Sequence, residues 1–119
     1  MKIEKIVNNN NIVAIVSGDE KVIIDSQSAL DLVMTVKYET GADKIGIDKK
    51  IVAEDFFILS TGLAGEILQK FINYNIKIAI FGDYSKYTSK PLKDFIYESN
   101  CGKDIFFVET KDEAIRRLG

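Results

Sequence analysis

Hydrophobic residues along the chain fall into short runs that alternate with longer amphipathic segments. Five short apolar runs predict β-strands at residues 3–7, 12–16, 44–48, 76–81 and 105–108. Four longer segments carry apolar residues three and four positions apart, which predicts helices beginning near residues 25, 60, 89 and 110 and ending near residues 41, 75, 102 and 118. A single helical turn is expected at residues 54–57, before the second of these helices.

The order of these elements predicts the class of fold. Asn8–Asn11 separate the first two strands and predict a hairpin turn, because Asn adopts positive φ more readily than most residues. The later strands alternate with helices, which is typical of parallel β-α units. We therefore predict a single α/β domain over residues 1–119: a mixed sheet of four or five strands, with an N-terminal antiparallel hairpin and about four helices. Ligands of such sheets bind at the carboxyl ends of the strands, which are followed here by the loops at residues 48–60 and 82–89.

A glycine inside one predicted strand carries a prediction about packing. Gly46 lies in the middle of the run at residues 44–48, where a side chain would normally contribute to the sheet. Glycine in a strand interior often marks a close approach by another part of the molecule. We expect another element to pack closely against the sheet at this position.

Composition narrows the chemistry that the protein can perform. The 119 residues include no His and one Cys, Cys101, which excludes a Ser-His-Asp triad, an imidazole metal ligand and an internal disulfide. No apolar run is long enough to span a membrane, and the N-terminal residues have no apolar segment of signal-peptide length. The net charge of −2 argues against a nucleic-acid partner. We expect a cytoplasmic protein without a cofactor, and its Lys- and Ile-rich composition indicates a bacterial source.

One short motif resembles a known regulatory fold. The run Leu59-Ser60-Thr61-Gly62-Leu63-Ala64-Gly65 leads from a loop into an apolar helix. Together with the predicted element order, it resembles the STAS domains, which have the anti-sigma-factor-antagonist fold. The resemblance implies a STAS-like module that acts through protein contacts, with Ser60 at the position of the phosphorylatable serine. Leu59 stands where that family has an Asp beside the serine.

Longer motifs carry a second resemblance, which covers nearly the whole chain. They lie at residues 54–57 (EDFF), 61–71 (TGLAGEILQKF), 82–90 (GDYSKYTSK) and 92–100 (LKDFIYESN). These residues resemble the bacterial domain-of-unknown-function 4180 family. Because that family carries no established activity, the resemblance implies a common fold and no reaction.

Ser60 and Thr61 are the first candidate functional residues. A hydroxyl at the start of a helix caps its free N–H groups, which contributes about 1 kcal/mol of stability. The same N–H groups and the positive end of the helix dipole would stabilise a phosphate. Both interpretations stay open: Ser60 and Thr61 cap the helix, or they form a phosphoacceptor or interaction site.

Glu54, Asp55 and Glu66 are a candidate acidic cluster. Neighbouring carboxylates do not face each other on a helix, so Glu54 and Asp55 do not form an acid–base pair. In one interpretation they solvate a turn that buries the two Phe residues after them. In the other, Glu66 lies close enough to complete a set of oxygen ligands for a divalent metal. We assign no metal ligands on this pattern alone.

The segment after the strand at residues 76–81 is the densest polar stretch of the chain. It supplies a carboxylate, five hydroxyls and an amine from Asp83, Tyr84, Ser85, Lys86, Tyr87, Thr88 and Ser89. Such a loop suits binding, and its lysine with Lys90 and the hydroxyls would hold an anion; the alternative is a plain solvated loop. We predict that it lies at the same end of the sheet as Ser60.

Three classes of function remain compatible with these observations. The leading hypothesis is a non-enzymatic protein-interaction or regulatory module with a protein partner, and a homodimer is left open. The first alternative is a small-ligand or anion-binding domain that uses the loop from Asp83 to Lys90. The second alternative is a small enzyme whose chemistry does not depend on His. No membrane partner is expected.

Overall fold

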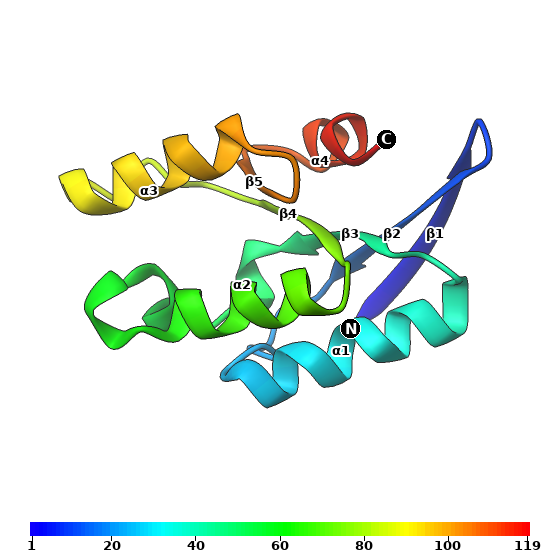
Figure 1. Ribbon diagram of the computed structural model, residues 1–119, viewed down its shortest axis with the longest axis horizontal. Helices are drawn as coiled ribbons and strands as arrows, with labels where there is room; N and C mark the ends of the chain where they lie inside the picture. The colour runs from blue at the N-terminus through cyan, green and yellow to red at the C-terminus, as the bar shows by residue number, and fades with distance from the viewer.

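The computed structural model describes residues 1–119, apart from the side chain of Asn8, and arranges them as a sheet with helices on both faces (Figure 1). The strands are β1 (Lys2–Asn8), β2 (Asn11–Ser17), β3 (Lys44–Asp48), β4 (Lys77–Phe81) and β5 (Ile105–Val108). The helices are α1 (Ser26–Thr40), α2 (Leu63–Asn73), α3 (Lys90–Cys101) and α4 (Lys111–Leu118). Three short 3₁₀ turns follow β3: η1 (Lys49–Ile51), η2 (Glu54–Phe57) and η3 (Leu59–Thr61). The α/β prediction is confirmed.

The sheet has the strand order β1-β2-β3-β4-β5. β1 and β2 form the expected antiparallel hairpin, and the other neighbouring strands are parallel. The hairpin turn uses Asn9 and Asn10, whose φ angles are 50° and 71°. Two successive residues with positive φ match the twist of a tight hairpin, so the asparagine run performs the role predicted from the sequence.

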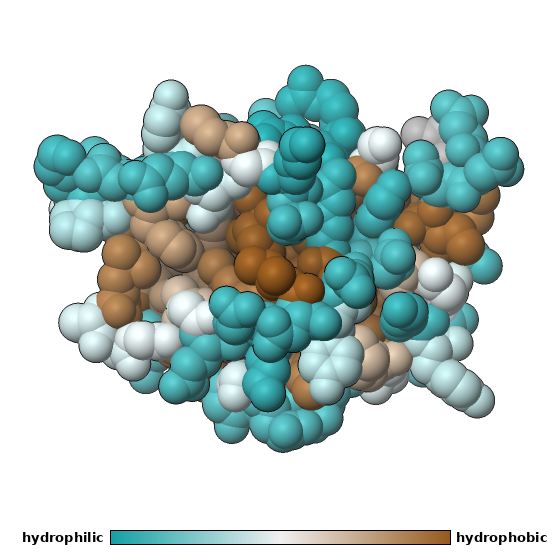
Figure 2. All heavy atoms as spheres, viewed as in Figure 1, coloured by the Kyte–Doolittle hydropathy of each residue, from teal (hydrophilic) through white to brown (hydrophobic). Residues whose placement is uncertain are grey.

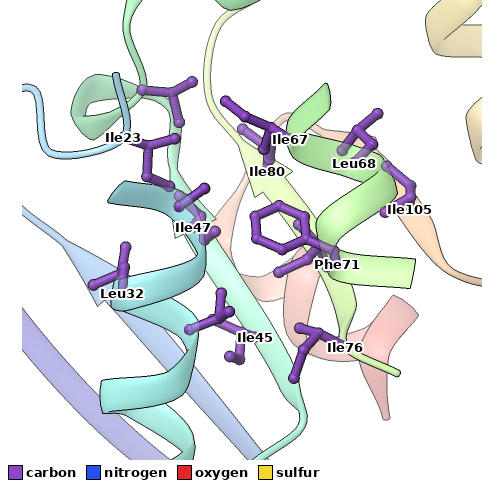
Figure 3. Packing of buried hydrophobic residues seen from close by; sticks show 14 of the residues in the cluster. Ile23, Leu32, Ile45, Ile47, Ile67, Leu68, Phe71, Ile76, Ile80 and Ile105 are labelled. Atoms are coloured by element: carbon purple, nitrogen blue, oxygen red, sulfur yellow. The ribbon is translucent and has the colours of Figure 1, made fainter. Parts of the chain in front are cut away.

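The larger part of the core lies on the face of the sheet that is covered by α1 and α2. Isoleucines of β3 and β4 meet apolar side chains of both helices there, as Figure 3 shows for Ile45, Ile47, Ile80 and Phe71. Leu92 at the start of α3 joins the same cluster, and α3 packs along the edge strand β5. Right-handed crossovers between parallel strands taken in order place their helices on one face, which explains this arrangement.

The opposite face of the sheet is covered by α4 alone among the helices that the structure describes. Ala114 and Leu118 of α4 are fully buried, and they contact the sheet over β3, β4 and β5. Gly46 leaves room on this face for Ile15 of the neighbouring strand β2, because a Cβ atom at Gly46 would lie 2.5 Å from Cδ1 of Ile15. The same Cβ atom would lie 3.6 Å from Cβ of Ala114, which is an ordinary contact with α4. The predicted close approach at Gly46 is present, but the side chain that makes it belongs to the adjacent strand β2 and not to an element packed against the sheet.

The helices are short and mixed in polarity. Over the part of the chain that the structure describes, no helix combines the length and the apolar character that a membrane crossing requires.

Candidate functional site

The two loops expected to carry function meet at the carboxyl ends of β3 and β4. η1, η2 and η3 follow β3, and the segment at residues 82–89 follows β4. Both segments contribute to one cavity of about 560 Å³, which we call the apolar cleft; it is lined by Phe57, Ile58, Leu59, Ser60, Lys86, Tyr87, Thr88, Ser89, Pro91 and Leu92. Ser60 and the second loop therefore lie at the same end of the sheet, as predicted.

The apolar cleft has hydrophobic walls and a rim of hydroxyl groups. Phe57 and Leu92 are each 4% exposed and belong to the core. Ile58, in contrast, leaves 50% of its surface exposed at the cleft. In Figure 2 hydrophobic side chains are visible between α2 and α3, bordered by polar ones. The cleft therefore extends the core of the protein to the surface.

A second cavity adjoins the cleft and has a different character. It measures about 290 Å³ and is lined by Lys21, Asp48, Lys49, Lys50, Glu54, Gly82, Asp83 and Lys86; we call it the lysine cavity. Lys86 lines both cavities. One charged side chain thus stands at the boundary between an apolar and a basic surface.

Lys49 is the most unusual residue of this region, because it is a lysine with only 9% of its surface exposed. Its Nζ lies 4.9 Å from the ring centre of Phe57, 5.9 Å from that of Tyr84 and 4.8 Å from that of Tyr87. Ring faces attract a cation at such distances. Gly82 makes room for the lysine stem, since a Cβ atom there would lie 2.6 Å from Cβ of Lys49.

Glu54 links the two loops through ion pairs with two lysines and a hydrogen bond from a tyrosine. Its Oε1 lies 3.1 Å from Nζ of Lys86 and 3.5 Å from Nζ of Lys49. Its Oε2 accepts a hydrogen bond of 3.0 Å from the Tyr87 hydroxyl. η2 therefore fixes the position of the loop at residues 82–89 through one carboxylate.

The protonation of these groups follows from their surroundings. Burial lowers the pKa of the Lys49 amine, and Glu54 counters only part of that effect. Burial alone would raise the pKa of Glu54, but the bonds from Lys86 and Tyr87 and the charge of Lys49 outweigh it and hold that pKa below its usual value. Glu54 is therefore a carboxylate at neutral pH.

The tyrosines of the loop are held in their neutral form. Burial raises the pKa of Tyr84, and burial together with the bond to Glu54 raises that of Tyr87. The Tyr84 hydroxyl donates a hydrogen bond of 2.7 Å to the carbonyl oxygen of Ile80. Tyr84 thus acts as a structural support for the loop, whereas the ring of Tyr87 forms a wall of the cleft.

The prediction that Ser60 caps a helix is wrong. α2 begins at Leu63, and its N-cap is Gly62, which has a φ of 77° and provides no side-chain cap. Ser60 is exposed and lies one turn earlier, in η3. Thr61 takes part of the expected role, because its hydroxyl accepts a bond of 3.2 Å from the Leu63 amide and donates to the carbonyl oxygens of Asp55 and Ile58.

The three predicted acidic residues do not form a cluster. Glu54 points to lysines, Asp55 is exposed in η2 and Glu66 lies exposed on the first turn of α2. Among the described residues, no group of three His, Cys, Asp or Glu side chains is placed to hold a metal ion. The hypothesis that Glu54, Asp55 and Glu66 hold a divalent metal is therefore wrong, because the carboxylate of Glu54 is engaged by Lys49, Lys86 and Tyr87.

The remaining loop residues divide between the two cavities and the helix that follows. Asp83 lines the lysine cavity, and its Oδ1 accepts a bond of 2.8 Å from the Ser85 amide. Thr88 and Ser89 line the rim of the apolar cleft. Ser89 occupies the N-cap position of α3 without a side-chain capping bond.

Sequence reasoning missed Lys49. A lysine that follows a strand normally lies in solvent, and nothing in its immediate neighbours marks it as buried. Two other segments of the sequence contain the residues that surround Lys49: Phe56-Phe57, which is aromatic, and Gly82–Tyr87, which combines a glycine with two tyrosines. Neither segment reveals its contact with Lys49 until the chain folds.

The order of elements and the motif residues can now be compared with known protein families. The model of a family described as a domain of unknown function, DUF4180, matches residues 8–118. The chain belongs to the DUF4180 family. The comparisons with curated proteins and with solved structures found no match. The DUF4180 match covers every residue of both cavities and supplies no reaction for them.

Proposed function

We propose that this DUF4180 domain is a non-enzymatic binding module that takes the apolar part of a small ligand into the apolar cleft. The observation that carries the proposal is the cleft itself, a hollow of about 560 Å³ where core residues reach the surface. Small-molecule sites usually have volumes of roughly 300–1,000 Å³, apolar walls and a few polar groups at the rim. Ser60, Thr88 and Ser89 supply such polar groups here.

The polar side chains around the cleft favour binding over catalysis. General acid–base work requires a group that exchanges protons near neutral pH. The pKa of Glu54 is lowered and that of Tyr87 is raised, so that each keeps one protonation state around pH 7. The sequence also contains no His. Glu54 and Tyr87 therefore do not supply the proton-transferring group that acid–base catalysis near pH 7 requires.

A regulatory role through a protein partner is the second candidate, and one observation favours it. Ile58 is 50% exposed and Ser60 is exposed, both at the rim of the cleft. A partner that contacts this rim would respond to whether the cleft is filled. In this proposal the domain is a STAS-like regulatory module of the bacterial cytoplasm, and the free thiol of Cys101 is in keeping with a reducing compartment.

The proposal is tested with 1-hexanol as an apolar probe and with NMR shifts of the backbone amides as readout. We expect saturable shifts of amides in η2, η3 and residues 86–92, with a dissociation constant of about 1 mM, or about −4 kcal/mol. Thr88→Trp fills the cleft and should abolish these shifts. Thr35→Trp changes an exposed threonine of α1 in the same way and should leave them intact. Shifts that are absent, or that lie elsewhere in wild type, would refute the proposal.

A further inference from the structure

We propose that the lysine cavity is a phosphate-binding subsite, and that the ligand of this domain is an alkyl or aryl phosphate. Its phosphoryl group would bind among Lys21, Lys49 and Lys86, and its apolar part would occupy the adjoining cleft. The second half of this inference rests on the proposed function, whereas the phosphate subsite stands on the geometry of the lysine cavity alone.

The first support is an excess of positive charge in a confined space. Four lysines and three carboxylates line the cavity. Two of the carboxylates already accept backbone N–H groups: Asp48 accepts from the Lys50 amide at 3.0 Å, and Asp83 from the Ser85 amide at 2.8 Å. The third, Glu54, is shared by two ammonium groups. These bonds hold the carboxylates in place without changing their charge, and four ammonium groups against three carboxylates leave the cavity lining with a net charge of +1.

The second support is the set of lysines that have no carboxylate partner. Among the described side chains, neither Lys21 nor Lys50 has a carboxylate oxygen within 4.0 Å. The charges of Lys21 and Lys86 also contribute to lowering the pKa of Lys49, although burial is the larger cause. An anion placed between these groups would relieve their mutual repulsion.

The third support is the rigid placement of Lys49. Its stem lies against Gly82, and its ammonium group faces three aromatic rings. Because the side chain is ordered before any ligand binds, little conformational entropy remains to be lost on binding. Its low exposure also strengthens its attraction to an anion, since screening by water is reduced.

A dianion with several oxygens fits this cavity better than a carboxylate does. The cavity already contains the carboxylate of Glu54, which pairs with Lys49 and Lys86 and accepts a hydrogen bond from Tyr87, and Lys21 still has no carboxylate partner. A phosphoryl group presents three acceptor oxygens and carries close to two charges at neutral pH. It can therefore contact Lys21 as well as the lysines that share Glu54.

The connection between the two subsites is Lys86, which lines both cavities. The ring of Tyr87 lies in the wall of the apolar cleft, and its hydroxyl bonds to Glu54 in the lysine cavity. A ligand with a phosphate next to a short apolar chain can thus fill both spaces at once. Linking two weakly binding groups in one molecule raises the affinity above that of either group.

The experiment compares inorganic phosphate, hexyl phosphate and 1-hexanol at constant ionic strength, with calorimetry and amide NMR shifts as readouts. We expect hexyl phosphate to bind at least about tenfold more tightly than either phosphate or hexanol. Lys49→Met should weaken hexyl phosphate at least about tenfold and leave hexanol unchanged, because it removes the charge and keeps the stem. Lys90→Met, which removes an exposed lysine paired with Asp94 outside both cavities, is the control for net charge.

Two further measurements keep the test independent of folding. Lys21→Met removes an exposed lysine of the same cavity and should weaken phosphate binding even if Lys49→Met were to unfold the chain. In wild type, phosphate should raise the pKa of Lys49, measured from the Cε chemical shift across a pH titration, since a bound anion favours the charged amine. A merely structural lysine would show no such response.

The outcomes separate this inference from the proposed function. Binding of hexanol with no phosphate-dependent shifts around the lysine cavity would overturn the phosphate subsite and leave the cleft in place. Binding of phosphate without hexanol would support the phosphate subsite and overturn the proposed function. Equal losses in Lys49→Met and Lys90→Met would show that phosphate responds only to net charge, which would overturn the inference.

Discussion

The ring and the hydroxyl of Tyr87 have separable roles, and two substitutions distinguish them. The ring stacks on Phe57 with a centre-to-centre distance of 5.2 Å, and Nζ of Lys49 lies 4.8 Å from its centre. The hydroxyl donates to Oε2 of Glu54 at 3.0 Å. Tyr87→Phe removes only the hydrogen bond, whereas Tyr87→Ala removes the ring as well.

The structure indicates how large each effect should be. A hydrogen bond to a charged group contributes about 1.5–3 kcal/mol, but the Glu54 side chain is 46% exposed and can regain water. We therefore expect Tyr87→Phe to cost about 0.5–1 kcal/mol. Removal of a fully buried aromatic ring lowers the free energy of unfolding by about 3–5 kcal/mol. Because the ring of Tyr87 is only partly buried, we expect Tyr87→Ala to lower it by about 2–3 kcal/mol.

Urea unfolding followed by circular dichroism gives both free energies. Tyr97 lies 71% exposed on α3, so Tyr97→Phe and Tyr97→Ala serve as controls and should stay within about 0.5 kcal/mol of wild type. Tyr87→Phe should also raise the pKa of Glu54, because one of the bonds that lower it is lost. Equal costs for the two Tyr87 variants, or an unchanged pKa of Glu54 in Tyr87→Phe, would refute this account.

Three further predictions address packing, capping and pH. Gly46→Ala should lower the free energy of unfolding in urea by about 1–3 kcal/mol. Adding Ile15→Val to Gly46→Ala should recover part of that loss, because it removes the Cδ1 atom that the new Cβ would meet at 2.5 Å. A double variant that loses the full sum of the two single costs would contradict the contact. Ser60→Ala should change the free energy of unfolding by less than about 0.5 kcal/mol. Thr61→Ala should lower it by about 1 kcal/mol, because the Thr61 hydroxyl makes hydrogen bonds to the backbone. A larger loss in Ser60→Ala than in Thr61→Ala would indicate that Ser60 is the capping residue. Burial raises the pKa of Tyr84, so the tyrosine loses its proton at lower pH in the unfolded chain than in the folded one. Tyr84 alone should therefore lower the free energy of unfolding by about 1.4 kcal/mol per pH unit above about pH 10, and Tyr87, whose pKa is also raised, adds to that fall. Tyr84→Phe should reduce that slope, and an unchanged slope would contradict the assignment.

The fold was largely predictable because its signals are local. Short apolar runs indicate the strands, and apolar residues three to four positions apart indicate the helices. Asn9 and Asn10 adopt the positive φ values that the hairpin requires. Gly46 indicated a close contact before its partner was known. α4 was predicted as a helix, but its position on the opposite face of the sheet comes only from the packed structure.

The site was less predictable because its contacts join distant segments. Ser60 was expected to cap α2, yet the N-cap is Gly62, two residues later, which adopts a left-handed conformation. Lys49 was not predicted at all, because a charged residue after a strand normally indicates solvent. Its burial depends on rings from η2 and from the loop after β4, and on the space that Gly82 leaves.

Intermolecular NOEs from hexyl phosphate to the protein test the central claim most directly, because they place both ends of the ligand at once. The account predicts NOEs from the terminal methyl group to Phe57 and Leu92, and from the first methylene, next to the phosphate, to the side chain of Lys86. The same pattern should vanish in Thr88→Trp and persist in Thr35→Trp. NOEs from the chain to another face of the domain, or none in a sample saturated with hexyl phosphate, would contradict the account.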